Sequence, residues 1–376
     1  FEENNFLNKK GKILNFFKKI FYKKFYSFSE IGFKRIKEIL YEKKNFINIY
    51  TILEIIKKFF KFIKFDIIDD TLDSLENKNI YNSGKLLSLK FEKSFIKILK
   101  NIKFKIRNFN NINDLDFVIE KDIITLDLKD YFCNNELSQF LDQNNPLSEL
   151  SHIRKISLIG NNIKKENCGF DIRDLHVSHY CKICPIDTPE GHNIGLINSF
   201  SFYSKVNKYN YISTIYKISF IGKIIGVIFL DYKKEKLKNI ANFLSTKKTI
   251  YGEIFKFPYI EIRKKINYNK KKFFFIDLVE ISGDQIVSIG ASLIPFLSNN
   301  DANRCLMGSN MQRQAVPLIK ADNPIVGTGN ELIIGLNSRY NILSDIKGYV
   351  LYLDSYNIIV KNNFKIKKYQ ICKFLR

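Results

Sequence analysis

The chain has 376 residues and a formal net charge of +23, and 45% of its residues are hydrophobic. This length exceeds the usual size of one domain, so we expect two or three sub-domains with hydrophobic cores of their own. Six cysteines are too few for a disulfide framework and suit a reducing compartment, and no stretch reaches the roughly 20 apolar residues of a membrane-spanning helix, so a disulfide-stapled protein and a transmembrane protein are both excluded.

The amino-acid usage is skewed in one direction. The chain contains 34 Phe and 20 Tyr but no Trp, and Lys far outnumbers Arg. Residues with A/T-rich codons have replaced those with G/C-rich codons, which indicates an AT-rich genome such as that of a plastid or a reduced endosymbiont. Cations that neutralise phosphates drive nucleic-acid binding, but a Lys-enriched genome weakens that inference from charge alone. We interpret Phe1 and the run that ends at Arg376 as cuts through a longer protein.

Residues 1–65 are rich in Lys, Phe and Ile at helical spacing. Thr51 and Glu54 form a capping-box pattern that predicts the start of a helix. The apolar face of this helix is predicted to pack in a core and consists of Ile52, Ile55, Ile56, Phe59 and Ile63. A second helix is predicted after Ser83–Gly84. Its apolar positions are Leu86, Leu87, Phe91, Phe95, Ile98 and Leu99.

Two polar stretches flank this second helix. Asp69, Asp70 and Asp73 resemble a metal-binding acidic cluster, although such a run is more often a solvated loop. Residues 108–116 are rich in Asn and Asp and are predicted to be a linker.

All four histidines lie within residues 126–199. His176, His179, Cys181 and Cys184 are residue types that bind tetrahedral zinc. Zinc modules normally place a longer loop between their ligand pairs, whereas one residue separates the pairs here and no second Cys-x-x-Cys follows. Structural or phosphate-facing histidines are the favoured interpretation. A non-catalytic, zinc-containing nucleic-acid-binding module is the alternative function, and a cationic membrane-surface protein is a third.

The loop from Cys184 to Gly195 contains two prolines and two glycines, so we expect a rigid, irregular conformation that holds polar side chains in place. No Lys-Ser/Thr pair follows, which argues against a P-loop. Upstream, residues 138–157 are predicted to form two short helices, the second starting at Pro146 with Asn145 as its cap. Donors that suit a phosphate–sugar path occur here, namely Gln139, Gln143, Asn144, His152, Arg154 and Lys155.

Residues 200–285, including Ile218–Leu230, are predicted to be β-rich. Residues 300–314 are predicted to form a helix that ends before Pro317, and short strands are predicted again from Leu332 to residue 364. The predicted helix carries an amide-rich stripe, with two arginines beside it, that suggests hydrogen bonding to phosphate or ribose. The stripe and its arginines are Asn303, Met307, Asn310, Gln314, Arg304 and Arg313.

Several long stretches resemble bacterial-type β subunits of DNA-directed RNA polymerase, in the same order and with the same spacing. Three resemble the fork region: Ser138–Gly160, Gly169–His176 and Cys184–Ser199. Four resemble the next signature block: Ile286–Leu297, Asp301–Arg304, Asn310–Pro317 and Val326–Gly329. Residues 28–70 and 84–87 match more loosely, so the resemblance covers residues 30–376.

The resemblance implies an α+β, multi-domain internal fragment of a large polymerase subunit. The implied parts are the mostly helical end of a lobe-like domain (1–75), a protrusion-like helical segment (76–137), a mixed α/β fork region with RNA- and rifamycin-site motifs (138–200), a β-rich external region (201–285), an NTP- and RNA-contacting block (286–331) and a truncated β-rich segment (332–376).

The resemblance also implies functional residues. It assigns no catalytic residue to this chain and gives Arg304 a supporting contact with the phosphates of the incoming NTP. The other implied NTP or RNA contacts are Gln139, Asn193, Arg313 and Gln314. A rifamycin pocket is implied at Gln139, Phe140, Asp142, His152, Lys155 and Ser157, with Glu190 and Ile197 at its edge. Residues 160–170 would form the fork loop near downstream DNA.

The implied reaction is phosphodiester formation by two-metal catalysis. No magnesium-binding Asp triad is visible here, so the resemblance places Mg²⁺ on the largest subunit, gives this chain no cofactor or metal, and implies that the fragment alone is inactive. The other implied partners are the α dimer, a σ-type factor, the DNA template, nascent RNA and NTPs, with no membrane. The codon bias favours a plastid (apicoplast) as the location, with the bacterial cytoplasm second.

Four positions depart from the family pattern. Lys155 stands where an Arg is usual, which removes a planar, bidentate donor from the implied rifamycin pocket. Asn161-Asn162 replace the usual Pro/Gly turn of the fork loop, Cys181 replaces a Gly, and His192 occupies a variable site. The Cys-x-x-Cys pattern is therefore interpreted as accidental.

Overall fold

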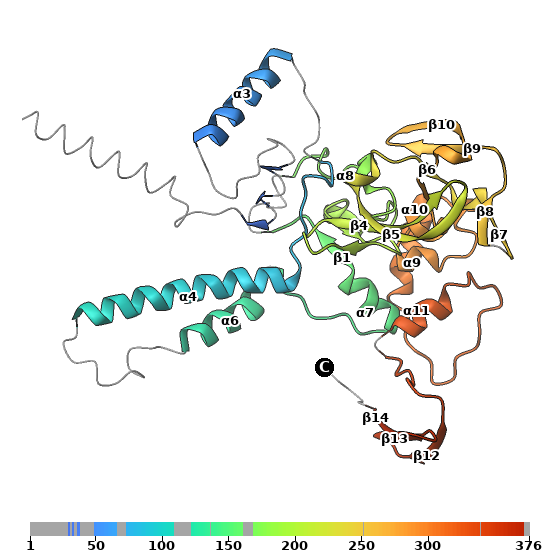
Figure 1. Cartoon of the computed structure of the whole chain (residues 1–376). Helices are drawn as coiled ribbons and strands as arrows, with labels where there is room; N and C mark the ends of the chain where they lie inside the picture. The colour runs from blue at the N-terminus through green and yellow to red at the C-terminus, as the bar shows by residue number, and fades with distance from the viewer. Residues whose placement is uncertain are drawn as a thin grey trace, which may run out of the picture. The chain divides into compact units, whose positions relative to one another are not determined.

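The computed structural model describes residues 29–30, 32–33, 36–37, 49–65, 73–108, 122–135, 137–160, 168–250, 252–338 and 340–371 (Figure 1). The chain divides into two compact units, Phe1–Leu72 and Asp73–Arg376. The expectations for Asp69, Asp70, the Asn161-Asn162 turn and most of the 108–116 linker lie outside the described residues. None of the helices in the described ranges is long and apolar enough to cross a membrane.

The described residues of the first unit include a long helix, α3 (Ile49–Phe65). Thr51 lies inside this helix and is buried, so the predicted helix start at Thr51 is wrong. The predicted core packing is also wrong, because the five apolar side chains of that face have exposed fractions between 38% and 62%. Helical spacing shows which side chains share a face, but it does not show that another element covers that face.

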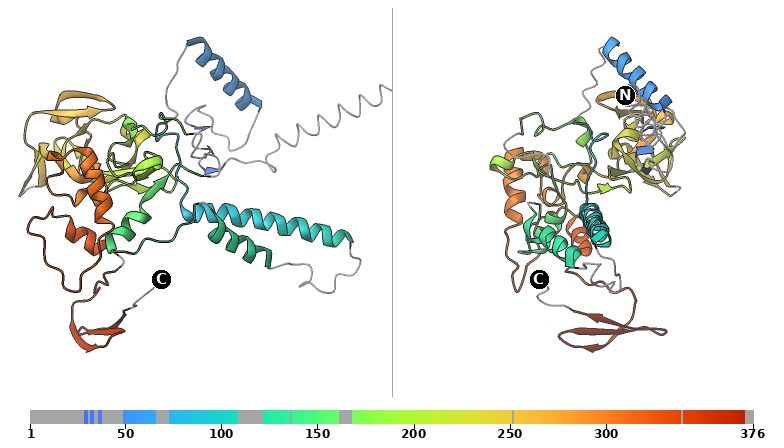
Figure 2. Two further views of the ribbon diagram at one scale, coloured as in Figure 1. Left: turned by 180° about the vertical axis from the view of Figure 1, so that it is seen from behind. Right: turned by 90° about the vertical axis from the view of Figure 1, so that its left-hand side faces the viewer.

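The second unit begins with two helices that lie side by side, α4 (Ser83–Asn108) and α6 (Asp122–Asn134) (Figures 1 and 2). Helix α4 confirms the helix predicted after Ser83. The Asp127 carboxylate joins the pair, since it accepts a hydrogen bond from the buried Ser94 hydroxyl at 2.8 Å and lies 2.9 Å from the Lys97 ammonium group. Burial of Ile98 adds an apolar contact to this polar joint.

The next segment contains helix α7 (Pro146–Ile153) and strand β1 (Lys155–Ser157), which pairs antiparallel with β2 (Ile197–Ser199). The Asn145 side chain caps α7, as predicted. The other predicted helix is wrong, because residues 138–145 are not helical. Asn145 has extended backbone angles, as residues before proline usually do.

The β-rich region confirms the prediction for residues 200–285. A nine-stranded sheet has the order β10-β9-β6-β11-β4-β5-β8-β7, with β3 paired to β4, and among its pairs only β6 and β11 run parallel. Its strands are β3 (Lys205–Val206), β4 (Ile212–Phe220), β5 (Lys223–Asp231), β6 (Ile240–Ala241), β7 (Thr246–Thr249), β8 (Gly252–Phe255), β9 (Tyr259–Lys264), β10 (Asn267–Lys272) and β11 (Leu278–Val279). A short helix, α8 (Tyr232–Glu235), follows β5. The sheet buries two apolar clusters, formed by Ala241, Ile260, Ile262, Ile276 and Val279 and by Tyr216, Leu230, Ile240 and Leu278.

Helices α9 (Ile289–Ser292), α10 (Ala302–Gln312) and α11 (Glu331–Asn337) follow the sheet. Helix α10 confirms the helix predicted over 300–314, with Asp301 as its cap. The strand predicted at Leu332 is wrong, because that residue lies in α11. Glu331, the first residue of α11, accepts hydrogen bonds from the backbone N–H groups of Thr328 and Gly329. These contacts anchor the start of the helix and outweigh the strand preference of the β-branched residues that follow.

Three antiparallel strands complete the described chain, β12 (Tyr349–Leu353), β13 (Asn357–Lys361) and β14 (Ile366–Gln370). Short 3-10 turns occur at η2 (Val177–His179), η3 (Gly191–Asn193), η4 (Phe243–Ser245), η5 (Phe273–Phe275), η6 (Gly283–Ile286) and η7 (Leu297–Asn299).

Candidate nucleic-acid interface

The segment before α7 is organised around the His152 imidazole. Its Nδ1 accepts a hydrogen bond from the Asp142 backbone N–H at 3.0 Å, and its Nε2 lies 3.0 Å from Gln139 Oε1. Burial, followed by the charge of Lys155, lowers the pKa of His152. A neutral ring that accepts at Nδ1 carries its proton on Nε2, so it donates to the Gln139 amide. Gln139, Asp142 and His152 are thus held together, and the Phe140 ring beside them is fully exposed.

Strands β1 and β2 place Ser157 directly opposite Ile197. Lys155, two residues before Ser157, is exposed, and its pKa is lowered by partial burial and by the charge of Arg313. The neighbouring Arg154 points the other way. Its guanidinium is largely buried and donates to the carbonyl oxygens of Ser201, Phe202 and Ser204, so its predicted place on a phosphate path is wrong.

The predicted rigid loop is present, and Arg173 holds it. One guanidinium nitrogen donates to the carbonyl oxygens of His192 at 2.8 Å and Ile194 at 2.9 Å. Gly195 follows with φ +73°, and a Cβ atom there would lie 2.5 Å from the Arg173 carbonyl oxygen. Glycine is therefore required at this close approach. The loop presents Glu190, which is exposed, and Asn193, which is half-buried and whose Oδ1 has no hydrogen-bond partner among the described residues.

The two His and two Cys side chains that match a zinc pattern in the sequence serve as helix caps and buried side chains. His176 Nδ1 accepts from the Ser178 N–H at 3.1 Å, and His179 Nδ1 accepts from the His176 N–H at 3.3 Å, so the two rings cap η2. Cys181 and Cys184 are buried, and burial raises the pKa of both thiols. In the described part of the chain, no group of three His, Cys, Asp or Glu side chains could hold a metal ion.

His179 makes the stability of this region dependent on pH. Burial, the neighbouring His176 and nearby lysines lower its pKa from 6.5 to about 4. Between these values the unfolded chain binds the proton more tightly, so the contribution of His179 to stability is complete above pH 6.5 and is lost as the pH drops through 4, by about 2–3 kcal/mol.

His179→Asn, which keeps an acceptor for the His176 N–H, should reduce the pH dependence of the unfolding free energy across this window in denaturant titrations. His192→Gln alters an exposed ring and is the control, which should keep the wild-type slope.

Helix α10 presents Arg304 near its start. The guanidinium is exposed, and its Nη1 lies 3.9 Å from Met307 Sδ one turn along the helix. Arg313, at the other end, has a different environment. It is 8% exposed, its Nη1 donates to Asp187 at 2.9 Å, and its Nη2 donates to Asn310. The guanidinium that the resemblance assigns to an RNA contact is thus engaged with two side chains of this chain.

One amide joins the two motif-rich segments. Asn145 Nδ2 donates to the carbonyl oxygens of Gln312, Arg313 and Ala315 at 3.1, 3.2 and 2.8 Å. Residues more than 160 positions apart in sequence therefore meet at the end of α10, next to Gln314. Arg304 lies roughly 12 Å further along, since it precedes Gln312, the last residue of the helix, by eight positions of about 1.5 Å each. Sequence reasoning identified Asn145 as a cap but missed this second role, and it missed Asp187 as the partner of Arg313.

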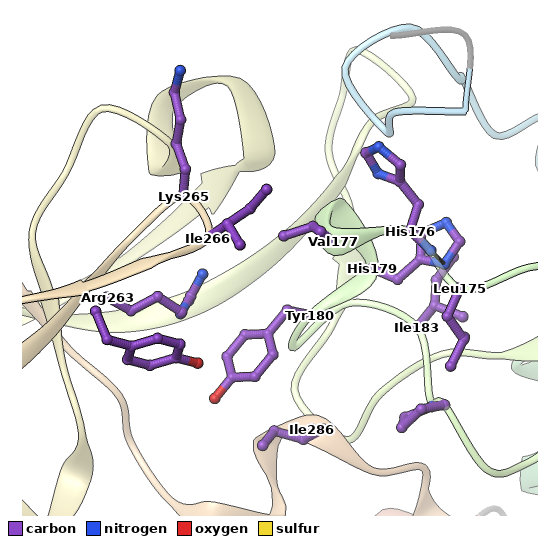
Figure 3. A pocket seen from close by; sticks show the side chains of 12 residues that line it. Leu175, His176, Val177, His179, Tyr180, Ile183, Arg263, Lys265, Ile266 and Ile286 are labelled. Carbon is purple, nitrogen blue, oxygen red and sulfur yellow. Dashed lines mark hydrogen bonds between the residues drawn. The ribbon is translucent and has the colours of Figure 1, made fainter. Parts of the chain in front are cut away.

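A second feature that sequence reasoning missed is a cavity of about 320 Å³, lined mainly by residues 175–185 and by the β9–β10 hairpin. Figure 3 shows Arg263 and Ile266 of the β9–β10 hairpin on one side, and Val177 and His179 on the other, with Tyr180 between them. The Arg263 guanidinium lies 4.2 Å from the centre of the Tyr180 ring. Behind the cavity, Arg263 pairs with Glu235 at 3.0 Å, and Glu235 also pairs with the fully buried Lys182. No local signal in the sequence marks this buried cluster, since its members come from separate elements.

Comparisons with known proteins agree with the resemblance seen in the sequence. Residues 139–206 match the family model described as RNA polymerase Rpb2, domain 3. The chain is 68% identical over 370 residues to the DNA-directed RNA polymerase subunit beta of Carsonella ruddii (strain PV), which covers 98% of this chain and 29% of the relative. It is 43% identical over 299 residues to the subunit from Kosmotoga olearia, covering 78% of this chain and 25% of the relative. For Ehrlichia ruminantium (strain Welgevonden) the identity is 38% over 314 residues, covering 82% and 22%.

The chain thus spans less than a third of the length of these relatives. The matched residues include the loop that Arg173 holds, the α7 cap and, in the longest alignment, almost the whole described fold. The chain belongs to the bacterial DNA-directed RNA polymerase β-subunit family and corresponds to a partial segment of such a subunit.

Proposed function

We propose that this chain is the part of a polymerase β subunit that lines the RNA–DNA hybrid and the NTP site during transcription. The observation that carries the proposal is the Asn145 joint, because it brings the Gln139–His152 segment to the end of α10 beside Gln314. Amide and cationic donors from two distant segments then lie together, as phosphate and sugar recognition requires. The β-subunit relatives support the same assignment.

Each proposed contact follows from the chemistry of its side chain. Arg304 is exposed and offers a planar, permanently charged donor to the triphosphate of the incoming nucleotide. Gln139, Asn193 and Gln314 offer amides to the nascent RNA. Arg313 acts indirectly, since its ion pair with Asp187 fixes the backbone next to Gln314.

Catalysis requires the rest of a multisubunit complex in this proposal. Carboxylates of the largest subunit would hold Mg²⁺, which would supply activation of the attacking hydroxyl and neutralisation of the developing phosphate charge. This chain supplies positioning and charge stabilisation of the nucleotide, so we propose that it is inactive alone. The largest subunit, the α dimer, a σ-type factor and template DNA are the proposed partners.

A rifamycin-type pocket is proposed at the same surface. Gln139 and Asp142 both contact His152, and Ser157 faces Ile197 on the adjoining strands. Phe140, which is exposed, belongs to the proposed pocket, Glu190 and Ile197 form its edge, and Lys155 replaces the family's usual arginine. The named relatives come from bacteria, which favours a reduced bacterium over a plastid as the source of this chain.

Arg304→Ala tests the proposal in the assembled polymerase. Loss of a charged hydrogen-bonding partner for the triphosphate should raise the apparent KM for NTPs by roughly 10- to 100-fold. Promoter binding, measured by mobility shift, should not change. Lys270→Ala removes an exposed cation on the β10 hairpin and is the control. Equal losses of NTP affinity and promoter binding would indicate misfolding and contradict the proposed role.

A further inference from the structure

The Asn145 side chain lies between the ends of two helices and contacts both. It is 8% exposed. Its Oδ1 accepts from the Ser148 N–H at 2.7 Å and caps α7, while Ser148 Oγ accepts from the Asn145 N–H at 3.1 Å. Its Nδ2 faces the opposite way, toward the three carbonyl oxygens at the end of α10. Only an amide offers an acceptor and a donor at opposite sides of one short side chain.

The carbonyl oxygens at the end of α10 need such a donor. The last four carbonyls of a helix have no partner within it, and they are often satisfied at a glycine with left-handed angles. Helix α10 ends instead at Arg313, which has right-handed helical angles. Asn145 donates to the carbonyls of Arg313 and Ala315, so the chain is held immediately before and immediately after Gln314.

A buried ion pair holds the same point from the other side. Asp187 Oδ1 accepts from Arg313 at 2.9 Å, and its Oδ2 accepts from Ser288 Oγ at 2.8 Å. Ser288 Oγ also accepts from the Ala291 N–H and so caps α9. The backbone around Gln314 is therefore fixed to α7 and to α9, while the Gln314 side chain itself is exposed.

We propose that Asn145 is a positioning residue that aims the Gln314 amide at the nascent RNA. This inference rests on the proposed function. It predicts that Asn145 acts on RNA retention through Gln314, and that it has little effect on NTP binding by Arg304 at the far end of α10. A residue that merely stabilised the fold would affect both.

The test is a double-mutant cycle in the assembled polymerase, read as the rate at which RNA leaves a halted elongation complex. Serine caps helices about as well as asparagine but is shorter and has no amide nitrogen, so Asn145→Ser keeps the cap of α7 and removes the Nδ2 contacts with α10. Asn145→Ser and Gln314→Ala should each speed RNA release by about three- to tenfold. The double variant should release RNA no faster than the quicker single variant, because the effects of two residues that act through one contact do not add. The apparent KM for NTPs should change less than about twofold, since independent sites do not couple.

Two further variants sharpen the cycle. Asn145→Asp keeps the cap but turns a second acceptor toward three carbonyl oxygens, so it should release RNA faster than Asn145→Ser. Asn242→Ser is the matched control, because Asn242 caps η4 in the sheet through the Leu244 N–H, and it should leave release unchanged.

Additive effects in the double variant would overturn the inference, as would an Asn145→Ser enzyme with normal RNA release. If Gln314→Ala speeds release and Asn145→Ser does not, the proposed RNA contact stands and only the positioning role fails. If Gln314→Ala has no effect, the RNA contact fails as well. Failure of both Asn145→Ser and Asn145→Thr to assemble would show that the amide serves folding instead, and would likewise overturn the role.

Discussion

Replacing Glu235 with Gln should lower the free energy of unfolding by about 3–5 kcal/mol, because it leaves buried cations without their counter-charge. Glu235 pairs with Lys182 and with Arg263, and all three side chains are at most 9% exposed. The remaining acid, Glu280, lies 3.9 Å from Arg263. Burial alone would raise the pKa of Glu235, but the charges of Lys182 and Arg263 outweigh it and lower that pKa below 4.5. The carboxylate therefore contributes its stability above pH 4.5, and this is lost as the pH falls through the folded-state pKa.

Denaturant titration of the intact chain measures this loss, and two variants separate its causes. Adding Lys182→Met to Glu235→Gln removes one uncompensated cation and should restore part of the stability. Glu253→Gln breaks the pair that Glu253 forms with Lys217 at 2.7 Å, whose side chains are both 18% exposed and so in better contact with solvent than the Glu235 cluster, and it should cost only about 1 kcal/mol. Equal losses for Glu235→Gln and Glu253→Gln would contradict the role assigned to the buried cluster.

Gly195→Ala should distort the loop that carries Asn193 and Glu190. The new Cβ would lie 2.5 Å from the Arg173 carbonyl oxygen, and φ of +73° adds the usual penalty for a side chain in left-handed geometry. The combined local cost is about 2–4 kcal/mol. The loop should move away from Arg173, and RNA synthesis by the assembled polymerase should fall by roughly tenfold or more.

Gly191→Ala is the matched control for this steric argument. Gly191 has φ of +85° in the same loop, but nothing lies within 4 Å of a Cβ atom there. It should therefore show the conformational penalty without the clash, about 1–2 kcal/mol, with most of the activity retained. If the two alanine variants synthesise RNA at the same rate, the close approach of Arg173 has no functional weight.

The parts of the fold that were predicted correctly have signals within a few residues of one another. Asn145 followed by Pro146 predicts the start of α7, and the residues from Asp301 onward predict α10. The errors lie where a contact with another residue, or the lack of such a contact, determines the local structure. Leu332 has a strand-like sequence but lies in a helix that Glu331 anchors, and the face of α3 that includes Ile52 and Phe59 is apolar yet exposed.

The candidate site shows the same limit. Sequence patterns select residues by type, but they cannot predict which way each side chain points. Arg154 and Arg313 are suitable phosphate ligands by type, yet Arg154 faces buried carbonyl oxygens and Arg313 faces Asp187. Lys155 is exposed, whereas its neighbours Arg154 and Ile156 are partly buried, because side chains alternate between the two faces of a strand.

Cys181 has left-handed backbone angles, with φ of 58°, and both its sulfur atom and that of Cys184 are buried. The thiolate is the form that reacts with oxidants and alkylating agents, and burial keeps both Cys181 and Cys184 protonated. Maleimide dyes should consequently label the folded chain at the exposed Cys133 and spare this pair. Changes in the redox conditions around the protein should therefore leave Cys181 and Cys184 unmodified until this part of the chain unfolds.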